Sequence, residues 1–455
     1  MALGRSALGW TAPGGGRKLP GMTERVPQDR AGTAGTCRAD VLRANVLRAE
    51  VLILGGGMVG LSLALALGGA GLAVVLVDRN DPAEVVAAPY DGRASAIAYG
   101  SRRVLDGLGA WAGMAGAAEP ILDIRVSDGD APLFLHYDHR ALGEEPLGHI
   151  VENRAIRQAL HARLAEVAAI DLRAPARLAD IAFAPGGVTA TLGDGARIRA
   201  SLVVAADGRD SALRERAGIP VTRWRYKQTG IVCTMGHARP HRGVAHERFL
   251  PAGPFAVLPM TDNPDGPAQG HRSSIVWTED ERLAPAMMAL DDDAFSAELA
   301  RRFGPYYGEV RVLGGRWSYP LSLLHADRYV APRLALVGDA AHAIHPIAGQ
   351  GLNLGIRGVA ALAEVLVEAA RLGLDIGGAE ALARYERWRR FDAMALVAVT
   401  DGLNRLFSNA IPPVRLIRDL GLAGVNLAAP AKRFFMRHAM GMVGDLPRLM
   451  KGERL

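Results

Sequence analysis

The pattern of apolar and polar positions near the start of the chain is typical of a buried strand, a helix and a second strand. The apolar run 51–54 leads into a glycine cluster, and the apolar run 61–67 and the β-branched run 73–77 follow. Residues 51–77 contain no charged side chain, a length that could cross a membrane. Glycines interrupt this stretch near both ends, so we predict a strand–helix–strand unit and no transmembrane span.

Two later segments also show an apolar strand that ends in a tight turn. The run 202–206 leads into Asp207-Gly208, and the run 334–337 leads into Gly338-Asp339. Strands that alternate with helices predict an α/β fold with a doubly wound, Rossmann-like sheet.

The composition is that of an ordinary globular protein, with 49% apolar and 22% charged residues. A length of 455 residues exceeds one compact core, so we expect two or three structural units. Two cysteines exclude a disulfide framework and a four-thiolate zinc site, and they are typical of a reducing compartment. No metal site is predicted.

The basic residues gather at the two ends of the chain. Lys and Arg exceed Asp and Glu by five in residues 1–48 and by six in residues 405–455, whereas the whole chain carries only +6. The main body is therefore mildly acidic, which argues against a nucleic-acid partner. The basic and apolar segment 411–451, with Arg415, Arg418, Lys432, Arg433 and Arg437, suits an anionic lipid surface. Two alternatives remain open: a solvated basic surface, and helices that pack on the core.

Residues 1–47 are predicted to be a disordered extension, because they are rich in glycine and lack a continuous apolar stretch. Their arginine content is also compatible with an organellar transit peptide, and Met22 with a later start.

The glycine cluster Gly55-Gly56-Gly57-Met58-Val59-Gly60 has the spacing of a dinucleotide-binding turn. Gly55 would form the turn, Gly57 would let a pyrophosphate approach the backbone, and Gly60 would let helix and strand pack closely. Asp78 follows the second strand, where a carboxylate can bind ribose hydroxyls. His342 is a candidate base, although such a histidine more often orders its own loop. No catalytic side chain can be assigned from the sequence.

The order of three motifs resembles the FAD-dependent aromatic monooxygenases of the p-hydroxybenzoate hydroxylase fold. These motifs are the glycine turn at 55–60, Asp207-Gly208, and Gly338-Asp339-Ala340-Ala341-His342 followed by Pro346. Further segments are similar to the ubiquinone-biosynthesis hydroxylases within that group, and the likeness runs from about residue 48 to the end. These segments are 91–97, 148–153, 226–228, 247–254, 401–407 and 439–441.

The resemblance implies a set of cofactor-binding residues. Gly55, Gly57 and Gly60 would meet the FAD pyrophosphate, Asp78 the adenosine ribose, and Asp339 the ribityl hydroxyls. Arg93 would lie along the flavin, Asp207 and Gly208 near the FAD and NAD(P)H phosphates, and Gly351, Leu352 and Asn353 at the pyrimidine edge of the isoalloxazine. Met58, Val59, Arg79, Asn153 and Pro346 complete the implied set.

The resemblance also implies the domain plan. Residues 48–220 and 322–375 would form the two parts of the FAD-binding domain, and 221–321 an inserted β-sheet domain that covers the substrate. Residues 376–455 would form a C-terminal helical region.

The implied activity is hydroxylation of the aromatic ring of a polyprenylated phenol in ubiquinone biosynthesis, with FAD, NAD(P)H and O2, through a flavin C4a-hydroperoxide. A flavin-dependent reductase or dehydrogenase of the same fold, or a hydroxylase of a soluble aromatic compound, is the alternative. The implied location is cytoplasmic, with a peripheral position on the inner face of the cell membrane as an open alternative. The membrane surface and other ubiquinone-biosynthesis enzymes are the candidate partners.

Overall fold

The computed structural model describes residues 46–129, 131, 134–262, 270–408, 418, 421 and 424–455. The predicted extension therefore lies outside the described residues, apart from Val46 and Leu47, which already belong to the first strand.

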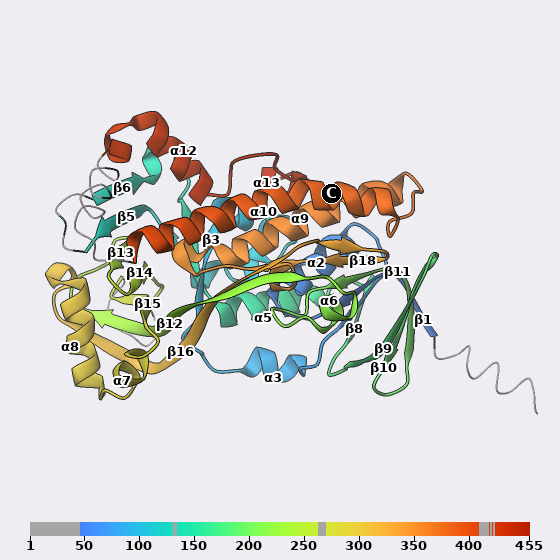
Figure 1. Cartoon of the computed structure of the whole chain (residues 1–455), viewed down its shortest axis with the longest axis horizontal. Coiled ribbons are helices and arrows are strands. Elements are labelled where there is room, and N and C mark those ends of the chain that lie inside the picture. Colours follow the sequence, from blue (N-terminus) through green and yellow to red (C-terminus); the bar gives the residue numbers. More distant parts are fainter. Residues whose placement is uncertain are drawn as a thin grey trace, which may run out of the picture. The chain divides into compact units, whose positions relative to one another are not determined.

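The first sheet contains the parallel strands expected of a doubly wound fold (Figure 1). Its strands are β1 (Val46–Leu54), β2 (Val74–Val77), β8 (Ile170–Arg173), β9 (Leu178–Ala184), β10 (Gly187–Leu192), β11 (Arg197–Ala205), β17 (Val330–Ala331) and β18 (Leu334–Leu336). The order β18-β11-β1-β2-β8 is parallel throughout, and the β9–β10 hairpin and β17 add antiparallel pairs at its margins. Strands such as Val74–Val77 are apolar at every position because helices or other chain segments cover both faces.

The helices of this domain pack on the first sheet and on one another. They are α2 (Met58–Gly69), α3 (Pro82–Ala87), α4 (Tyr99–Gly107), α5 (Asn153–Leu164), α6 (Ala212–Arg216) and α9 (Gln350–Arg371). Helix α2 is apolar around its whole circumference and packs between α9 and α5, so it is buried at nearly every position.

A small antiparallel sheet lies beside α9. It consists of β3 (Ala94–Ala98), β7 (Gly148–Glu152) and β4 (Ala118–Ile121), and β3 contacts the start of α9.

The second large sheet has the order β19-β16-β12-β15-β14-β13-β5-β6. Its strands are β5 (Asp123–Asp128), β6 (Phe134–Asp138), β12 (Val221–His237), β13 (Val244–Leu250), β14 (Gly253–Pro259), β15 (Arg272–Asp280), β16 (Val310–Ala326) and β19 (His342–Ala343). Neighbours are antiparallel except β13 and β5, which are parallel. The sheet therefore includes residues 123–128 and 134–138, which the resemblance assigned to the FAD-binding domain, and β16 continues past the expected boundary at 321.

The two faces of this sheet have different neighbours, and the side chains alternate between them. Phe255, Val257, Ile275 and Trp277 point toward helices α7 (Ala284–Met288) and α8 (Asp292–Phe303) and form a core with Phe295. Residues at the intervening positions face a cavity.

The C-terminal part is helical, as expected, and Figure 1 shows α10 running alongside α9. Its helices are α10 (Ala379–Phe407), α12 (Ala429–Ala439) and α13 (Arg448–Lys451). Met436 of α12 is fully buried against the sheets, in a cluster that includes Ile121, Ile150 and Ala245. Within the described ranges, every helix is too short or too polar to span a bilayer.

Candidate active site

The turn after β1 requires glycine for two different reasons. Gly55 has φ +107°, and a Cβ there would lie 2.3 Å from the carbonyl oxygen of Ala206. A Cβ on Gly60 would lie 1.9 Å from the carbonyl oxygen of Gly55. A Cβ on Gly57 would meet nothing within 4 Å. Gly55 and Gly60 are thus fixed by packing, whereas Gly57 faces open space in which a ligand could approach the backbone.

The N-terminus of α2 faces this open space. Its N-cap residue is Gly57, so no side chain satisfies the first amide groups of the helix. Uncapped N–H groups at a helix N-terminus bind phosphate well, because they donate hydrogen bonds and carry the positive end of the helix dipole.

The carboxylate of Asp78 orders the glycine turn. One oxygen accepts a hydrogen bond of 2.5 Å from the amide of Gly56, and the other accepts one of 2.7 Å from the amide of Asn80. Asp78 and the exposed Arg79 are not among the residues that line the cavity.

The Asp207-Gly208 and Gly338-Asp339 turns meet at the carboxyl ends of β11 and β18, which are adjacent. The buried guanidinium of Arg214 joins them, because it donates hydrogen bonds of 3.0 Å to the carbonyl oxygens of Arg209 and Ala340. Asp207 itself accepts a hydrogen bond of 3.4 Å from the amide of Leu213 in the first turn of α6, whose N-cap residue is Ser211, and it does not line the cavity.

Asp339 lies deep in the protein, yet its side chain remains accessible because it faces the cavity. Burial raises the pKa of its carboxyl group, and the nearby Arg209 lowers it. Arg209 also lines the cavity. A carboxylate in this position can accept hydrogen bonds from the hydroxyl groups of a polyol chain.

A second helix N-terminus borders the same cavity. Helix α9 begins after Gly349, which has φ +61° and offers no side-chain cap. Gly351, Leu352 and Asn353 of its first turn line the cavity together with Pro346.

The two asparagines of the predicted set form hydrogen bonds with other parts of the protein. Asn353 donates to the carbonyl oxygen of Ala96 at 2.7 Å and accepts from the amide of Ala98 at 2.9 Å, so it fixes β3 to α9. Asn153 accepts a hydrogen bond of 2.6 Å from the hydroxyl of Ser95. Ser95, which the sequence did not single out, lines the cavity.

Arg93 lies outside the cavity lining. Its guanidinium forms an ion pair with Asp91 at 2.5 Å, and its side chain is 47% exposed. His342, the candidate base, is buried, and desolvation lowers its pKa to about 3. His342 does not line the cavity, and its lowered pKa makes it a weak base, so the structure gives no support to a catalytic role.

One cavity of about 960 Å³ connects these groups with the second sheet. Of the predicted residues, nine line it: Gly57, Met58, Val59, Gly208, Asp339, Pro346, Gly351, Leu352 and Asn353. The remaining seven lie behind this wall or apart from it: Gly55, Gly60, Asp78, Arg79, Arg93, Asn153 and Asp207.

Away from the glycine turns the cavity is lined mainly by apolar side chains. They come from three parts of the chain: β5 and β6 (Ile124, Val126, Leu135), β13 to β15 (Ala245, Ala256, Leu258, Val276), and the C-terminal helices (Leu403, Leu406, Phe407, Phe435, Ala439). Polar groups among them are Tyr137, His246, Glu247 and Arg418. Sequence reasoning missed these four, because only the pairing of distant strands and the C-terminal chain brings them here.

The residues present fit FAD. Two helix N-termini without side-chain caps, an open glycine and an accessible carboxylate all border one cavity, and its volume is at the upper end of the usual range for ligand sites. Phosphates, ribityl hydroxyls and a flavin ring require these kinds of donors and acceptors.

Comparisons with known proteins agree with this fit. The family model described as "FAD binding domain" matches residues 48–400. In the solved structure of p-nitrophenol 4-monooxygenase PnpA from Pseudomonas putida, the fold is similar, with a TM-score of 0.71 at 20% identity over 87% of this chain and 98% of that one. The fold and the cavity define a flavoprotein, and the chain belongs to the FAD-dependent aromatic monooxygenases.

Two curated relatives narrow the position within this family. The ubiquinone hydroxylase UbiL of Rhodospirillum rubrum is 54% identical over 408 residues, which cover 89% of this chain and 93% of the relative. The 3-demethoxyubiquinol 3-hydroxylase of Escherichia coli is 36% identical over 404 residues, which cover 86% and 98%. The family predicted from the sequence motifs is thus confirmed.

Proposed function

We propose that this protein hydroxylates the aromatic ring of a polyprenylated phenol in ubiquinone biosynthesis and uses NAD(P)H and O2. The names of the two curated relatives support a substrate of this class. The observation that most supports the proposal is the apolar lining of the cavity. Apolar side chains of the second sheet and of the C-terminal helices, among them Phe407 of α10 and Phe435 of α12, line the same cavity as the cofactor-binding groups, which suits an isoprenoid tail.

Within this proposal the amides of Gly57, Met58 and Val59 hold the FAD pyrophosphate, and Asp339 holds the ribityl chain. The first turn of α9 donates to the pyrimidine edge of the flavin. Gly55, Gly60, Asp78 and Asn153 support these groups from behind, Pro346 lines the flavin space, and Gly208 borders the phosphates with Asp207. Arg93 stays assigned to the flavin, and Arg79 stays a member of the cofactor-binding set without an assigned contact.

When bound, FAD would supply the transfer of electrons from NAD(P)H to O2 and the activation of O2 for insertion of one oxygen atom into the ring. The chain's own residues orient the ring and exclude water. The side chains of Ile124, Val276 and Leu406 offer water no hydrogen-bond partner, so water competes poorly for the space beside the ring.

The substrate assignment predicts different coupling for two kinds of phenol. We expect a prenylated phenol in detergent or liposomes to stimulate NAD(P)H oxidation with most of the electrons recovered in hydroxylated product. A small water-soluble phenol, such as 4-hydroxybenzoate, should be turned over slowly and mostly with release of H2O2, because it leaves the apolar cavity partly filled with water. The measurement is product formed per NAD(P)H consumed, with 18O2 to identify the inserted oxygen.

The opposite result has a clear meaning. Fast, fully coupled turnover of 4-hydroxybenzoate, with prenylated phenols inert, would identify a hydroxylase of soluble aromatic compounds. NAD(P)H oxidation without incorporation of 18O into any phenol would identify a reductase.

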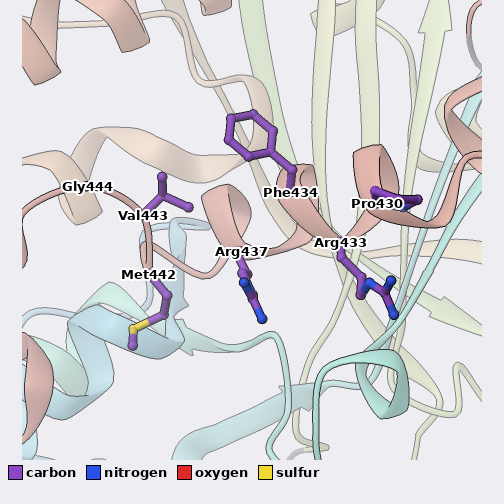
Figure 2. Close-up of a pocket in the computed structure, with 7 residues that line it drawn as sticks. All are labelled: Pro430, Arg433, Phe434, Arg437, Met442, Val443 and Gly444. Carbon is purple, nitrogen blue, oxygen red and sulfur yellow. The ribbon is translucent and has the colours of Figure 1, made fainter.

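We further propose that α12 lies on an anionic membrane surface. Figure 2 shows Arg433, Phe434 and Arg437 on this helix beside the loop of Val443 and Gly444. These residues line a hollow of about 450 Å³. Phe434 is 52% exposed, and neither arginine forms an ion pair with a described residue. Exposed aromatic and unpaired basic groups on one helix suit lipid headgroups.

The structure corrects one part of the sequence interpretation of this region. Arg418 is buried and forms an ion pair of 2.7 Å with Asp128, so it does not belong to a lipid-facing surface. Arg415 lies outside the described residues.

The double variant Arg433→Ala/Arg437→Ala tests the membrane proposal. Each basic residue near an anionic surface contributes about 1 kcal/mol, so the partition coefficient onto anionic liposomes should fall roughly 30-fold at low salt. Flotation measures it, with Arg197→Ala/Arg199→Ala on β11, remote from α12, as the matched control (Figure 1). Equal recovery of all proteins with neutral and anionic lipid would contradict the proposal.

A further inference from the structure

The cavity-facing side of the second sheet carries one carboxyl group in an otherwise apolar row. Glu247 of β13 is in register with Ala256 of β14 and with Val126 of β5. The row continues outward to Val276 of β15 and Leu135 of β6. All five residues line the cavity. Glu247 is thus at the centre of a five-strand row whose other members are aliphatic.

The alternation of side chains along β13 confirms the direction of Glu247. The ring of the preceding residue, His246, lies 5.1 Å from the ring of Phe303 and 4.8 Å from that of Tyr306, on the face that α8 covers. Both residues border the cavity, but His246 is opposite Val257 of the α8-facing core, whereas Glu247 is opposite the cavity-lining Ala256. The Glu247 side chain therefore points into the cavity.

The side-chain carboxyl group of Glu247 forms no hydrogen bond or ion pair with any described residue. Burial alone raises the pKa of its carboxyl group to about 7. Polar groups inside a protein are nearly always hydrogen-bonded, because an unpaired one costs free energy. A carboxyl group that faces a cavity without a partner in the protein therefore points to a partner in the ligand.

The neighbouring groups do not neutralise it. Arg418, which also lines the cavity, is engaged by Asp128 at 2.7 Å and donates to the carbonyl oxygen of Leu406 at 2.8 Å. Burial raises the pKa of Tyr137 to about 12, so this phenol stays neutral.

The groups behind the strand and at the far end of the cavity do not neutralise Glu247 either. Burial lowers the pKa of His246 to about 3, so it is neutral. The guanidinium of Arg248 donates to the carbonyl oxygens of Phe303 and Gly129. Arg209 and Asp339, of opposite charge, lie at the cofactor end. The charge that the apolar part presents to a ring is consequently negative whenever Glu247 is ionised.

We propose that Glu247 anchors the substrate ring and determines specificity. Its carboxylate accepts a hydrogen bond from a neutral phenolic hydroxyl and disfavours a ring that carries a carboxylate. The inference rests on the proposed function and adds to it that the preferred substrate bears no ionised acid on its ring. A hydroxyl group supplies the donor that Glu247 lacks, whereas a second carboxylate in the same apolar space adds like-charge repulsion.

The test compares two ligands on the FAD-loaded protein in detergent. One is a phenol with a ten-carbon isoprenoid tail ortho to the hydroxyl, and the other is the same molecule with a carboxylate para to the hydroxyl. Their dissociation constants are read from the change in flavin absorbance on the oxidised enzyme, without turnover. At pH 8 we expect the neutral phenol to bind at least about tenfold more tightly to the unmodified protein. Glu247→Gln should reduce the ratio to about threefold or less, chiefly because the carboxylated ligand binds more tightly.

The pH dependence separates a charge effect from a change of shape. Glu247 is ionised above its pKa of about 7 and neutral below it. The preference of the unmodified protein should therefore weaken from pH 8 to pH 6, and that of Glu247→Gln should stay constant. Glu309→Gln, at an exposed position of the same domain, is the matched control and should behave like the unmodified protein.

The outcomes distinguish the two levels of the proposal. Equal, pH-independent preferences in the unmodified protein and Glu247→Gln would overturn the role of Glu247 and leave the proposed function standing. If neither prenylated phenol perturbs the flavin of the unmodified protein, the proposed function fails and the role of Glu247 with it. Flavin content measured for each variant shows whether the substitution has disturbed the fold.

Discussion

Replacement of Gly60 by Ala should abolish stable folding, whereas replacement of Gly57 by Ala should leave the fold intact and weaken FAD binding. A Cβ on Gly60 would lie 1.9 Å from the backbone oxygen of Gly55, and backbone cannot move aside as a flexible side chain can. We expect a loss of several kcal/mol in the free energy of unfolding, by the mechanism of severe overpacking.

Gly57→Ala is the matched control for this prediction. Gly57 has φ −71° and ψ 176°, which any residue adopts, and its Cβ would meet nothing within 4 Å. The melting temperature of the apoprotein, followed by circular dichroism, should therefore stay unchanged. The added methyl group would occupy the space through which a phosphate approaches the helix, so the dissociation constant of FAD should rise by about tenfold or more. If Gly57→Ala binds FAD normally, the pyrophosphate does not lie at this turn.

Asp339→Ala should weaken FAD binding strongly without destabilising the apoprotein. The carboxylate faces the cavity, and each charge-assisted hydrogen bond that it accepts from a ribityl hydroxyl is worth roughly 1.5–3 kcal/mol. Loss of one such bond raises the dissociation constant about 10- to 150-fold. Flavin fluorescence titration of the apoprotein measures it, with the exposed Asp106→Ala on α4 as control. Purification of Asp339→Ala with full flavin content and normal affinity would refute the assignment.

The pH dependence of FAD affinity gives an independent check on Asp339. Burial raises the pKa of its carboxyl group, against the opposing effect of Arg209. Affinity that depends on the ionised form is complete above this pKa and is lost as the pH falls through it. The loss should begin at a higher pH than an ordinary aspartate would give, and Asp339→Asn should remove this step from the titration.

Short-range motifs singled out residues that the fold brings together at one cavity, and their role in binding the cofactor stays a prediction. Gly57, Gly208, Asp339 and Gly351 each lie within three residues of a strand end or a helix start, and such ends and starts are readable from local periodicity. All four line the cavity. The side chains of Asn153 and Asn353 lie in the same region, but they bind other parts of the chain, which no local pattern could indicate.

The ring-binding end could not be predicted in this way. Glu247 faces the cavity because β13 pairs with β5, a segment about 120 residues earlier in the chain. The polar positions of helix α9 give a second example, because Arg357 donates to the carbonyl oxygen of Val443 and Glu364 accepts from the amide of Arg448. A helix face that periodicity marks as exposed is thus covered by the last residues of the protein.

The order of strands in the first sheet has a consequence for synthesis on the ribosome. Strand β1 pairs in parallel with β11, which begins some 150 residues later in the chain. Strand β11 pairs in parallel with β18, which begins about 290 residues after β1. At a translation rate of about 5–20 residues per second, roughly 15–60 s pass between the synthesis of β1 and that of β18, and the sheet cannot be completed before then. During that interval the apolar strands β1 and β2 have exposed edges, so chaperone binding should concentrate on ribosomes that have not yet passed codon 336.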